Sequence, residues 1–349
     1  MLHALNVSHI KSTHHYFSFI CVCLTLFIGG TLSTSLYASH HSTSSTELPT
    51  CLHVASYAPG YPWLDGIERA LKQTLKGKCE LHSFYMDSKK VFDQTRLEEI
   101  AQAAKNHILT VHPDIVIVSD DNAVHYVLQR HFKDSPLPFV FCGVNKSALR
   151  YGLPYKNATG MIELAPTKLL LQSLFKQNLS QTHIAFLTTK GKTAHHNAAD
   201  FLAVTQQLKI TGVALSVATQ EDWRKAYKTL QEDPKTHLII LGNMASFPHW
   251  DHTRNLDWIK QHNHKLSIAT QPWMMNYVAF GMTKSSEEQG HWAGLTALSI
   301  LKGIPIKLLP ITPNQRFNTF VNPELAAPFI KQIPSQLVEQ AITFQSEQP

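Results

Sequence analysis

The sequence lacks the compositions that define most non-globular proteins. Its 349 residues include only 15 glycines, 18 prolines and 5 cysteines, which excludes collagen-like, low-complexity and disulfide-dense chains. Charged residues make up 16% of the chain, and 31 Lys and Arg against 25 Asp and Glu give a formal net charge of +6. The basic residues are scattered and form no stripe, so we expect no nucleic acid as partner. The composition is that of a folded globular protein.

Charge is also missing near the amino terminus, where Tyr16 to Ala38 contains no charged residue. Residues 17–28 are almost wholly apolar, Lys11 precedes them, and small and polar residues follow them. This order is typical of a secretory signal peptide, and such a stretch is also long enough for an uncleaved signal anchor. We therefore expect 1–38 to be a signal peptide or signal anchor and 39–49 a polar linker. The expected location is the periplasm, or the outer face of the inner membrane if the leader is retained.

No segment after the leader is apolar for 18 residues, so we expect membrane contact only through the leader. Beyond it the cysteines are Cys51, Cys79 and Cys142. Cys51 and Cys79 lie at the amino ends of two strands that we expect to be neighbours, where their Cα atoms could approach to disulfide distance. An oxidising compartment permits that bond. Cys51 and Cys79 are therefore a candidate disulfide.

Short apolar runs alternate with amphipathic segments along the rest of the chain. We expect strands at 52–57, 80–85, 114–119, 138–142, 183–188, 212–217 and 237–241, and helices between or after them at about 64–76, 94–109, 122–132, 166–177, 194–208, 221–231 and 251–262. Alternation of such strands with helices predicts parallel sheets covered on both faces. About 310 residues is enough for two domains. The sequence thus predicts an α/β protein with two successive Rossmann-like lobes.

Polar and aromatic residues follow several of these strands. In open parallel sheets ligands bind at the carboxyl ends of the strands, so these residues are candidate ligand contacts. In the first lobe they are Ser56, Tyr57, Tyr61, Trp63, Asp120, Asp121 and Asn145, and in the second Thr188, Asn243 and Trp273. Glu163 lies in the segment expected to cross between the lobes, where it is either a hinge residue or a ligand acceptor.

Several of these candidates have structural alternatives. Asp121 opens a helical pattern and is equally suited to cap that helix. Trp63 follows Pro62 at a helix start, where it could wedge the turn against the sheet. Asn145 could brace the turn after Cys142 through backbone hydrogen bonds. These alternatives stay open at the level of sequence.

Motifs for catalysis and metal binding are missing or incomplete. Gly191 opens a phosphate-loop-like run, but Phe186 stands where that loop needs its first glycine. No Gly-x-Ser-x-Gly elbow occurs, and Cys142 ends an apolar strand, where a thiol is usually inert. Histidines cluster at 195–196, 249–252 and 262–264 without three convergent ligands. We therefore expect no enzyme, no cofactor and no metal site, with a metal-binding protein or a hydrolase as remote alternatives.

Several runs of residues carry a family pattern in order along the chain. They are 56–63 (SYAPGYPW), 65–67, 84–90, 119–123 (SDDNA), 141–145 (FCGVN), 289–294, 297–303, 321–322 and 333–341. In these runs the chain resembles the ABC-transporter substrate-binding family of extracytoplasmic proteins, whose close relatives serve as sensor domains of histidine kinases. The resemblance implies a type I periplasmic-binding fold with a ligand cleft between two lobes. It places 50–158 and about 280–305 in lobe I, and 159–279 and about 306–345 in lobe II.

The resemblance also implies a function. It predicts a solute-binding protein that captures a small molecule between its lobes and delivers it to an ABC permease and its ATPase, which are separate chains. The alternative is a ligand-sensing module for a membrane signalling partner. Some relatives accept aromatic amino acids, so Tyr57, Tyr61, Trp63 and Trp273 would form a stacking cage, with Asp120 or Asp121 on an ammonium group. The expected ligand is an amino acid or another amine with an apolar or aromatic part.

Overall fold

The computed structural model describes residues 47–345 except 89–90, 92, 176–181, 245–246 and 248–249. The predicted leader and most of the predicted linker lie outside the described residues, as does His249 of one histidine cluster. Within the described part of the chain, no helix combines the length and the apolar character needed to cross a membrane.

The first sheet has six strands in the order β11-β5-β4-β3-β1-β2, and all of its pairings are parallel. Its strands are β1 (Thr50–Ala55), β2 (Glu80–Tyr85), β3 (Ile115–Ser119), β4 (Phe139–Asn145), β5 (Ala158–Glu163) and β11 (Thr312–Pro313). Every residue of β3 is buried, as expected for a strand covered on both faces. The carboxyl ends of β1, β3 and β4 therefore lie along one edge of this sheet.

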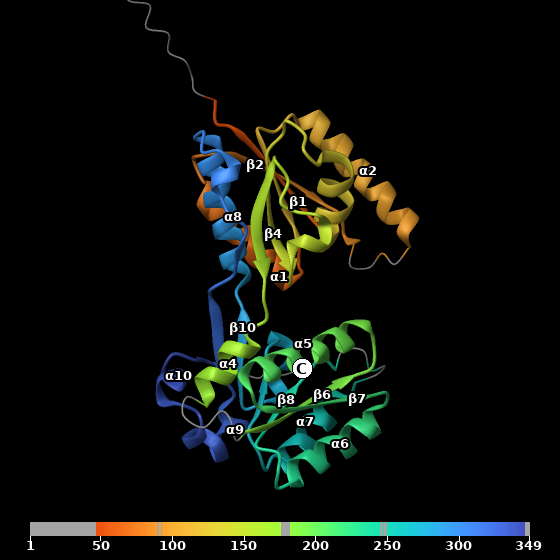
Figure 1. Ribbon diagram of the computed structural model, residues 1–349, viewed down its shortest axis with the longest axis vertical. Coiled ribbons are helices and arrows are strands. Elements are labelled where there is room, and N and C mark those ends of the chain that lie inside the picture. Colours follow the sequence, from red (N-terminus) through yellow and green to blue (C-terminus); the bar gives the residue numbers. More distant parts are fainter. Residues whose placement is uncertain are drawn as a thin grey trace, which may run out of the picture. The chain divides into compact units, whose positions relative to one another are not determined.

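Helices cover both faces of the first sheet (Figure 1). Helices α1 (Pro62–Leu75) and α8 (Ser286–Leu301) pack against each other and share a core with Ile115, Ile117 and Val140. On the other face lie α2 (Gln94–Val111) and η2 (Ala123–Phe132), which continues the short helix α3 (Asp120–Asn122). The short helix η3 (Ala148–Tyr151) follows β4.

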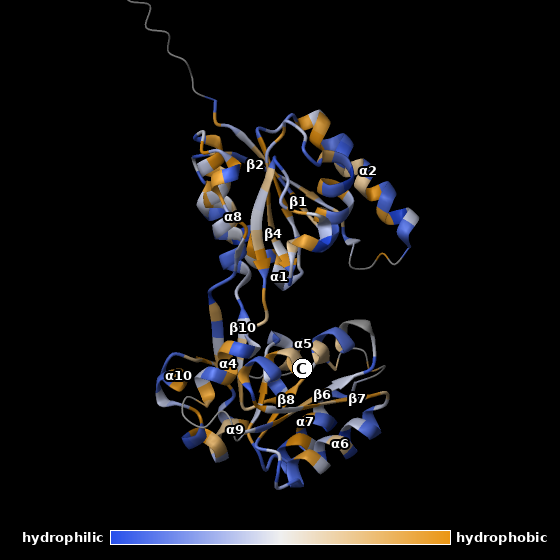
Figure 2. Ribbon diagram, viewed as in Figure 1, coloured by the Kyte–Doolittle hydropathy of each residue, from blue (hydrophilic) through white to orange (hydrophobic). Residues whose placement is uncertain are grey.

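The second sheet has seven strands in the order β13-β12-β10-β9-β8-β6-β7, parallel except for the pair β10–β12. The strands are β6 (His183–Thr189), β7 (Thr211–Val217), β8 (Leu238–Leu241), β9 (Ser267–Ala269), β10 (Phe280–Lys284), β12 (Phe317–Val321) and β13 (Ile342–Thr343). Figure 2 shows apolar residues along β6 and β8, which carry much of this core.

Helices α4 (Thr167–Leu174), α5 (Lys192–Leu208), α6 (Gln220–Glu232) and α7 (His252–Gln261) pack with the second sheet, together with the shorter η5 (Pro272–Tyr277), α9 (Pro323–Ala326) and α10 (Ser335–Glu339). Trp223 and Tyr227 of α6 are fully buried and stack at 5.1 Å between ring centroids. The short helices η6 (Ile306–Leu308) and η7 (Ala327–Gln332) complete the fold, with η7 following α9 directly.

All seven strands and seven helices predicted from periodicity are present, with ends that differ by a few residues. The prediction of two α/β units with mostly parallel sheets is confirmed. We keep the division into two lobes as a proposal, with three boundaries moved: β10 (residues 280–284) lies in the second sheet, β11 (residues 312–313) lies in the first, and the first boundary also shifts. Because β5 pairs with β4, residues 159–163 belong with the first sheet, and the chain leaves that sheet after Glu163. It returns between β10 and α8 and leaves again between β11 and β12.

Candidate functional site

The candidate site lies at the carboxyl ends of the strands of the first sheet. Asp120 follows β3 directly, and Trp63 stands at the start of α1, which follows β1. The indole Nε1 of Trp63 donates to Oδ1 of Asp120 at 2.9 Å. The aromatic and acidic residues predicted from separate strand ends are thus joined in the folded chain.

Asp120 is a buried carboxyl group with one free oxygen. Its side chain is only 3% exposed, and its Oδ2 makes no hydrogen bond to any described residue. Its backbone has a φ of +69°, an uncommon conformation for a residue with a side chain. Asp120 is thus held in an uncommon backbone conformation, with one carboxyl oxygen that lacks a donor among the described residues.

The surroundings of Asp120 favour its neutral form. Burial raises the pKa of Asp120 well above its usual value, and the nearby Glu163 and Asp121 act in the same direction. The hydrogen bond from Trp63 and the charge of Lys284 oppose this shift. An unpartnered buried acceptor costs free energy, so Asp120 is suited to bind a donor or cation that enters the site.

Asp121 is held differently, by side chains of the same sheet. Its Oδ2 accepts from Asn145 Nδ2 at 2.7 Å and its Oδ1 from the Tyr151 hydroxyl at 2.7 Å, with Arg150 at 3.9 Å. Ser119 is the N-cap residue of the helix that begins here, and Asp121 lies inside that helix with both oxygens bound by side chains, so the capping alternative for Asp121 is wrong. The side-chain amide of Asn145 thus binds Asp121. These contacts join the carboxyl end of β3 to the end of β4 and to η3, and they supply each oxygen of Asp121 with a donor.

Glu163 and Lys284 form an ion pair between the ends of β5 and β10. Glu163 is 6% exposed, and burial raises its pKa while Lys284 opposes the rise. The Lys284 ammonium also lies 5.4 Å from the centroid of the Trp63 ring, within cation–π range. The pair lies where the chain passes between the two sheets, at the end of β5 and the end of β10.

The remaining candidate residues of the first sheet are Tyr57, Tyr61 and Ser56, and they make different contacts within the protein. The rings of Tyr57 and Tyr61 meet edge to face at 4.9 Å between centroids, and burial, with the charge of Asp120, raises the pKa of Tyr57. The Ser56 hydroxyl donates to Ser119 O at 2.7 Å and accepts from Ala123 N at 2.8 Å. Ser56 therefore ties the ends of β1 and β3 together.

Three candidates lie at strand ends of the second sheet. The indole Nε1 of Trp273 donates to Asn243 Oδ1 at 3.1 Å, and Trp273 is 51% exposed. Thr188 is fully buried, and its Oγ1 has no hydrogen bond among the described residues. Trp273 is therefore the candidate of this group with apolar surface available to a ligand.

Sequence reasoning missed Lys284, Gly143 and Tyr151. Lys284 ends a strand that has no clear apolar periodicity, so nothing in the sequence marks it as a partner of Glu163. Gly143 has a φ of +69°, and a Cβ placed there would lie 2.8 Å from Asp120 Oδ1. A glycine just after the apolar run of a strand is the one signal that could have indicated a close approach.

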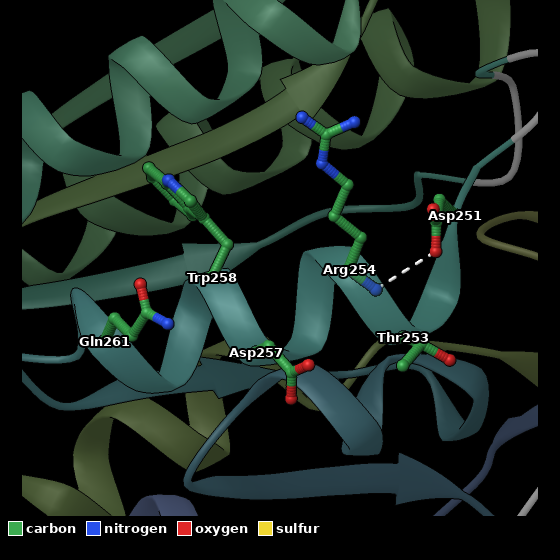
Figure 3. Close-up of a pocket in the computed structure, with 6 residues that line it drawn as sticks. All are labelled: Asp251, Thr253, Arg254, Asp257, Trp258 and Gln261. Atoms are coloured by element: carbon green, nitrogen blue, oxygen red, sulfur yellow. Dashed lines mark hydrogen bonds between the residues drawn. The ribbon is translucent and has the colours of Figure 1, made fainter.

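Away from these residues, a cavity of about 450 Å³ runs along α7 and is lined by Asp251, Thr253, Arg254, Asp257, Trp258 and Gln261 (Figure 3). Arg254 N donates to Asp251 Oδ1 at 3.0 Å, which caps the helix. The side chains of Arg254 and Asp257 point in opposite directions in Figure 3, so they do not converge on one ligand atom. In the described part of the chain, no group of three or more His, Cys, Asp or Glu side chains is placed to hold a metal ion.

No family model matches the chain, and no curated protein matches it in sequence. Its structure is similar to the ligand-free, open form of a substrate binding protein with adhesive properties from Clostridium difficile, with TM-score 0.66, 13% identity, and coverage of 86% of this chain and 100% of that chain. It is also similar to an ABC domain in complex with L-Trp from Streptococcus pneumonia, with TM-score 0.56, 14% identity, and coverage of 84% and 99%.

A maltose operon transcriptional repressor from Staphylococcus is similar too, with TM-score 0.50, 14% identity, and coverage of 80% of this chain and 99% of that chain. Binding proteins and a regulator therefore share this architecture, and at such identities the likeness is one of fold. The two mostly parallel sheets, between which the chain passes several times, agree with this fold. The chain has the fold of the type I periplasmic binding proteins.

Proposed function

We propose that this protein is an extracytoplasmic solute-binding protein for a small molecule that carries an ammonium group and an apolar or aromatic part. The observation that carries the proposal is the buried carboxyl group of Asp120, whose Oδ1 accepts from the Trp63 indole and whose Oδ2 has no partner among the described residues. A cation with an attached ring satisfies both features, since the carboxylate takes the charge and the aromatic groups take the ring.

In this proposal, Asp120 takes the ligand's charge and Trp63, Tyr57 and Tyr61 pack on its apolar part. Asp121 and Asn145 hold the strand ends around the ligand in place, and the hydrogen bond between them supports this role. Thr188, Asn243 and Trp273 contact the ligand from the second sheet. The fold's structural neighbour in complex with L-Trp supports a ligand of this kind.

The proposed mechanism is capture by closure. The lobes pivot about the segments that cross between them, and a ligand that touches both lobes stabilises the closed state. Only contacts that differ between the open and closed states can drive such a change. The Glu163–Lys284 pair lies at two of these crossing segments and is placed to respond to the ligand.

An ABC permease with its ATPase would read the closed state and receive the ligand. The alternative is a signalling partner that reads the same state, and the similarity to a repressor supports the use of this fold for sensing. Both versions place the protein in the periplasm or on the outer face of the inner membrane. Cell fractionation that recovers the protein from the cytosol would exclude both.

Native mass spectrometry of freshly purified protein tests the binding function. We expect a co-purified small molecule that carries an amine. Asp120→Asn should weaken its binding about tenfold or more, because a charge-assisted hydrogen bond contributes about 1.5–3 kcal/mol. Trp63→Ala should also weaken binding, and Lys331→Gln, an exposed change, should not. If Asp120→Asn and Trp63→Ala both bind like the parent protein, the ligand does not occupy this site.

A further inference from the structure

The acidic groups of the site are not equally neutralised. Asp121 receives hydrogen bonds from Asn145 and Tyr151, and Glu163 is paired with Lys284. Asp120 receives a single neutral donor, the Trp63 N–H, and its Oδ2 has no partner among the described residues. Asp120 is therefore the one carboxyl group of this cluster for which the structure shows neither a paired cation nor a second donor.

The groups that face Asp120 do not supply a countercharge. The groups near Asp120 are Trp63 of α1, Tyr57 after β1, Asp121 of α3, Cys142 and Gly143 of β4, Glu163 of β5 and Lys284 of β10. Lys284 is the cation in this set, and it is paired with Glu163. The immediate surroundings of Asp120 thus hold two further acids against one lysine.

A buried carboxylate without a countercharge is costly, and such a group avoids the cost by binding a proton. At 3% exposure Asp120 has little access to water that could solvate its charge. The charge balance of the empty site therefore favours a neutral carboxyl group at Asp120. A bound ammonium group reverses this balance, because it supplies both a charge and hydrogen-bond donors.

We propose that Asp120 holds a proton in the ligand-free protein and exchanges it for the ammonium group of the ligand, with one proton released for each ligand bound. This inference rests on the proposed function. The O–H bond of the Asp120 carboxyl group breaks, the proton passes to the solvent, and the carboxylate accepts hydrogen bonds from the entering ammonium. Charge is conserved within the site, since one cation replaces another.

The exchange defines the ligand class more narrowly. A ligand that keeps its positive charge at neutral pH can replace the proton, and a neutral analogue of the same shape cannot. Below the pKa of Asp120 in the free protein, affinity should fall about tenfold for each unit by which the pH drops, because each ligand competes with one proton. Above that pKa the affinity should become independent of pH.

Infrared difference spectroscopy of the ligand-free protein tests the first half of the proposal without any ligand. At neutral pH we expect the carbonyl stretch of a protonated carboxyl group in the parent protein and in Glu163→Gln. The band should be absent from Asp120→Asn. If it is lost in Glu163→Gln and kept in Asp120→Asn, or if the parent has no such band, the proposal is overturned.

Calorimetry tests the exchange itself, with tryptamine and L-tryptophan as probes that carry an ammonium group and indole-3-propionate as the matched probe without one. Titrations in phosphate and in Tris, which differ in ionisation enthalpy, count the protons released. We expect one proton released per ammonium-bearing probe bound in the parent and none in Asp120→Asn. Binding without proton release overturns the exchange while the proposed function stands. Failure of every probe to bind contradicts the proposed ligand class, and the infrared band then decides the protonation of Asp120 alone.

Discussion

Gly143 leaves the space that Asp120 occupies. A Cβ built on Gly143 would lie 2.8 Å from Asp120 Oδ1, closer than side-chain atoms tolerate. The backbone N–H of Gly143 also donates to the buried Gln289 Oε1 at 2.8 Å, which fixes the position of this bulged part of β4. The orientation of the Asp120 carboxyl group therefore depends on the absence of a side chain in the neighbouring strand.

Gly143→Ala should accordingly disturb the site as well as the fold. Gly77→Ala is a matched control, because Gly77 has a φ of +68° against +69° at Gly143 but has no atom within 4 Å of the added Cβ. Both variants should lose about 1–2 kcal/mol from the left-handed backbone. Gly143→Ala should lose at least about 1 kcal/mol more and bind the ligand at least tenfold more weakly. Urea unfolding and calorimetry measure the two effects, and equal losses in both variants would contradict this account.

A second buried network lies beneath the site, on the α1 face of the sheet. Glu68 is 6% exposed and accepts from the Tyr85 hydroxyl at 2.6 Å and from Lys72 Nζ at 2.9 Å. The buried His53 places Nδ1 3.6 Å from Glu68 and Nε2 3.0 Å from Ser119 Oγ. Burial acts to raise the pKa of Glu68, but His53, Tyr85 and Lys72 outweigh it and lower that pKa to about 2.

This lowered pKa predicts a pH-dependent contribution to stability. A carboxyl group with a lower pKa in the folded state stabilises the fold above its unfolded pKa, and the contribution disappears as the pH falls through the folded value. Glu68→Gln should therefore cost about 2–3 kcal/mol at pH ~7 and less than half of that at pH ~3. The exposed Glu99→Gln should change stability by less than about 0.5 kcal/mol at either pH. Urea unfolding at both pH values measures this, and a pH-independent loss in Glu68→Gln would contradict it.

The sequence predicted those strands and helices whose burial shows as a regular local pattern of apolar residues. The strand 115–119 is a run of apolar residues buried on both faces, and α6 has a clear apolar stripe around Trp223 and Tyr227. Such patterns follow from local burial, which periodicity reports directly. For the same reason the strand ends, and with them Asp120 and Trp63, could be placed at one edge of the sheet before the structure was known.

The missed elements depend on contacts between distant parts of the chain. Helix α8 has small residues where it meets α1, and a Cβ on its Gly290 would lie 2.1 Å from Ile67 O. This close helix–helix packing leaves α8 without a simple apolar stripe. Strand β5 contains Gly160, which lies against the Phe141 ring, and ends at the charged Glu163. The pairing of Glu163 with Lys284 joins residues 121 positions apart, which no local pattern can report.

The disulfide between Cys51 and Cys79 links the second residue of β1 to the residue before β2, with Cα atoms 5.9 Å apart. Cys142 is buried and has no disulfide partner. Peptide mapping without reduction should recover the Cys51 and Cys79 peptides joined, and Cys142 should be alkylated only after denaturation. Cys51→Ser should lower the free energy of unfolding by about 3–4 kcal/mol on the chain-entropy estimate for this loop. Recovery of all three as free thiols from protein purified without reductant would contradict the bond.

The second sheet allows a test that separates ligand contact from stability. Trp273 is 51% exposed and donates to Asn243 Oδ1, whereas Trp223 is fully buried among other aromatic rings. Trp223→Ala should cost about 3–5 kcal/mol, as expected when a large buried side chain is removed. Trp273→Ala removes little buried surface, so its cost should stay below about 1 kcal/mol.

Ligand binding should respond in the opposite way. If Trp273 packs on the ligand, Trp273→Ala should weaken binding severalfold to about tenfold, because a stacked ring contributes about 0.5–1.5 kcal/mol beyond its burial. Trp273→Phe should restore most of this loss, since it keeps a ring and removes only the indole N–H that Asn243 accepts. Calorimetry with the co-purified ligand measures the three affinities, and thermal unfolding confirms that the variants are folded. An unchanged affinity in Trp273→Ala would remove the second sheet's tryptophan from the proposed site and leave recognition of the ring to Trp63, Tyr57 and Tyr61.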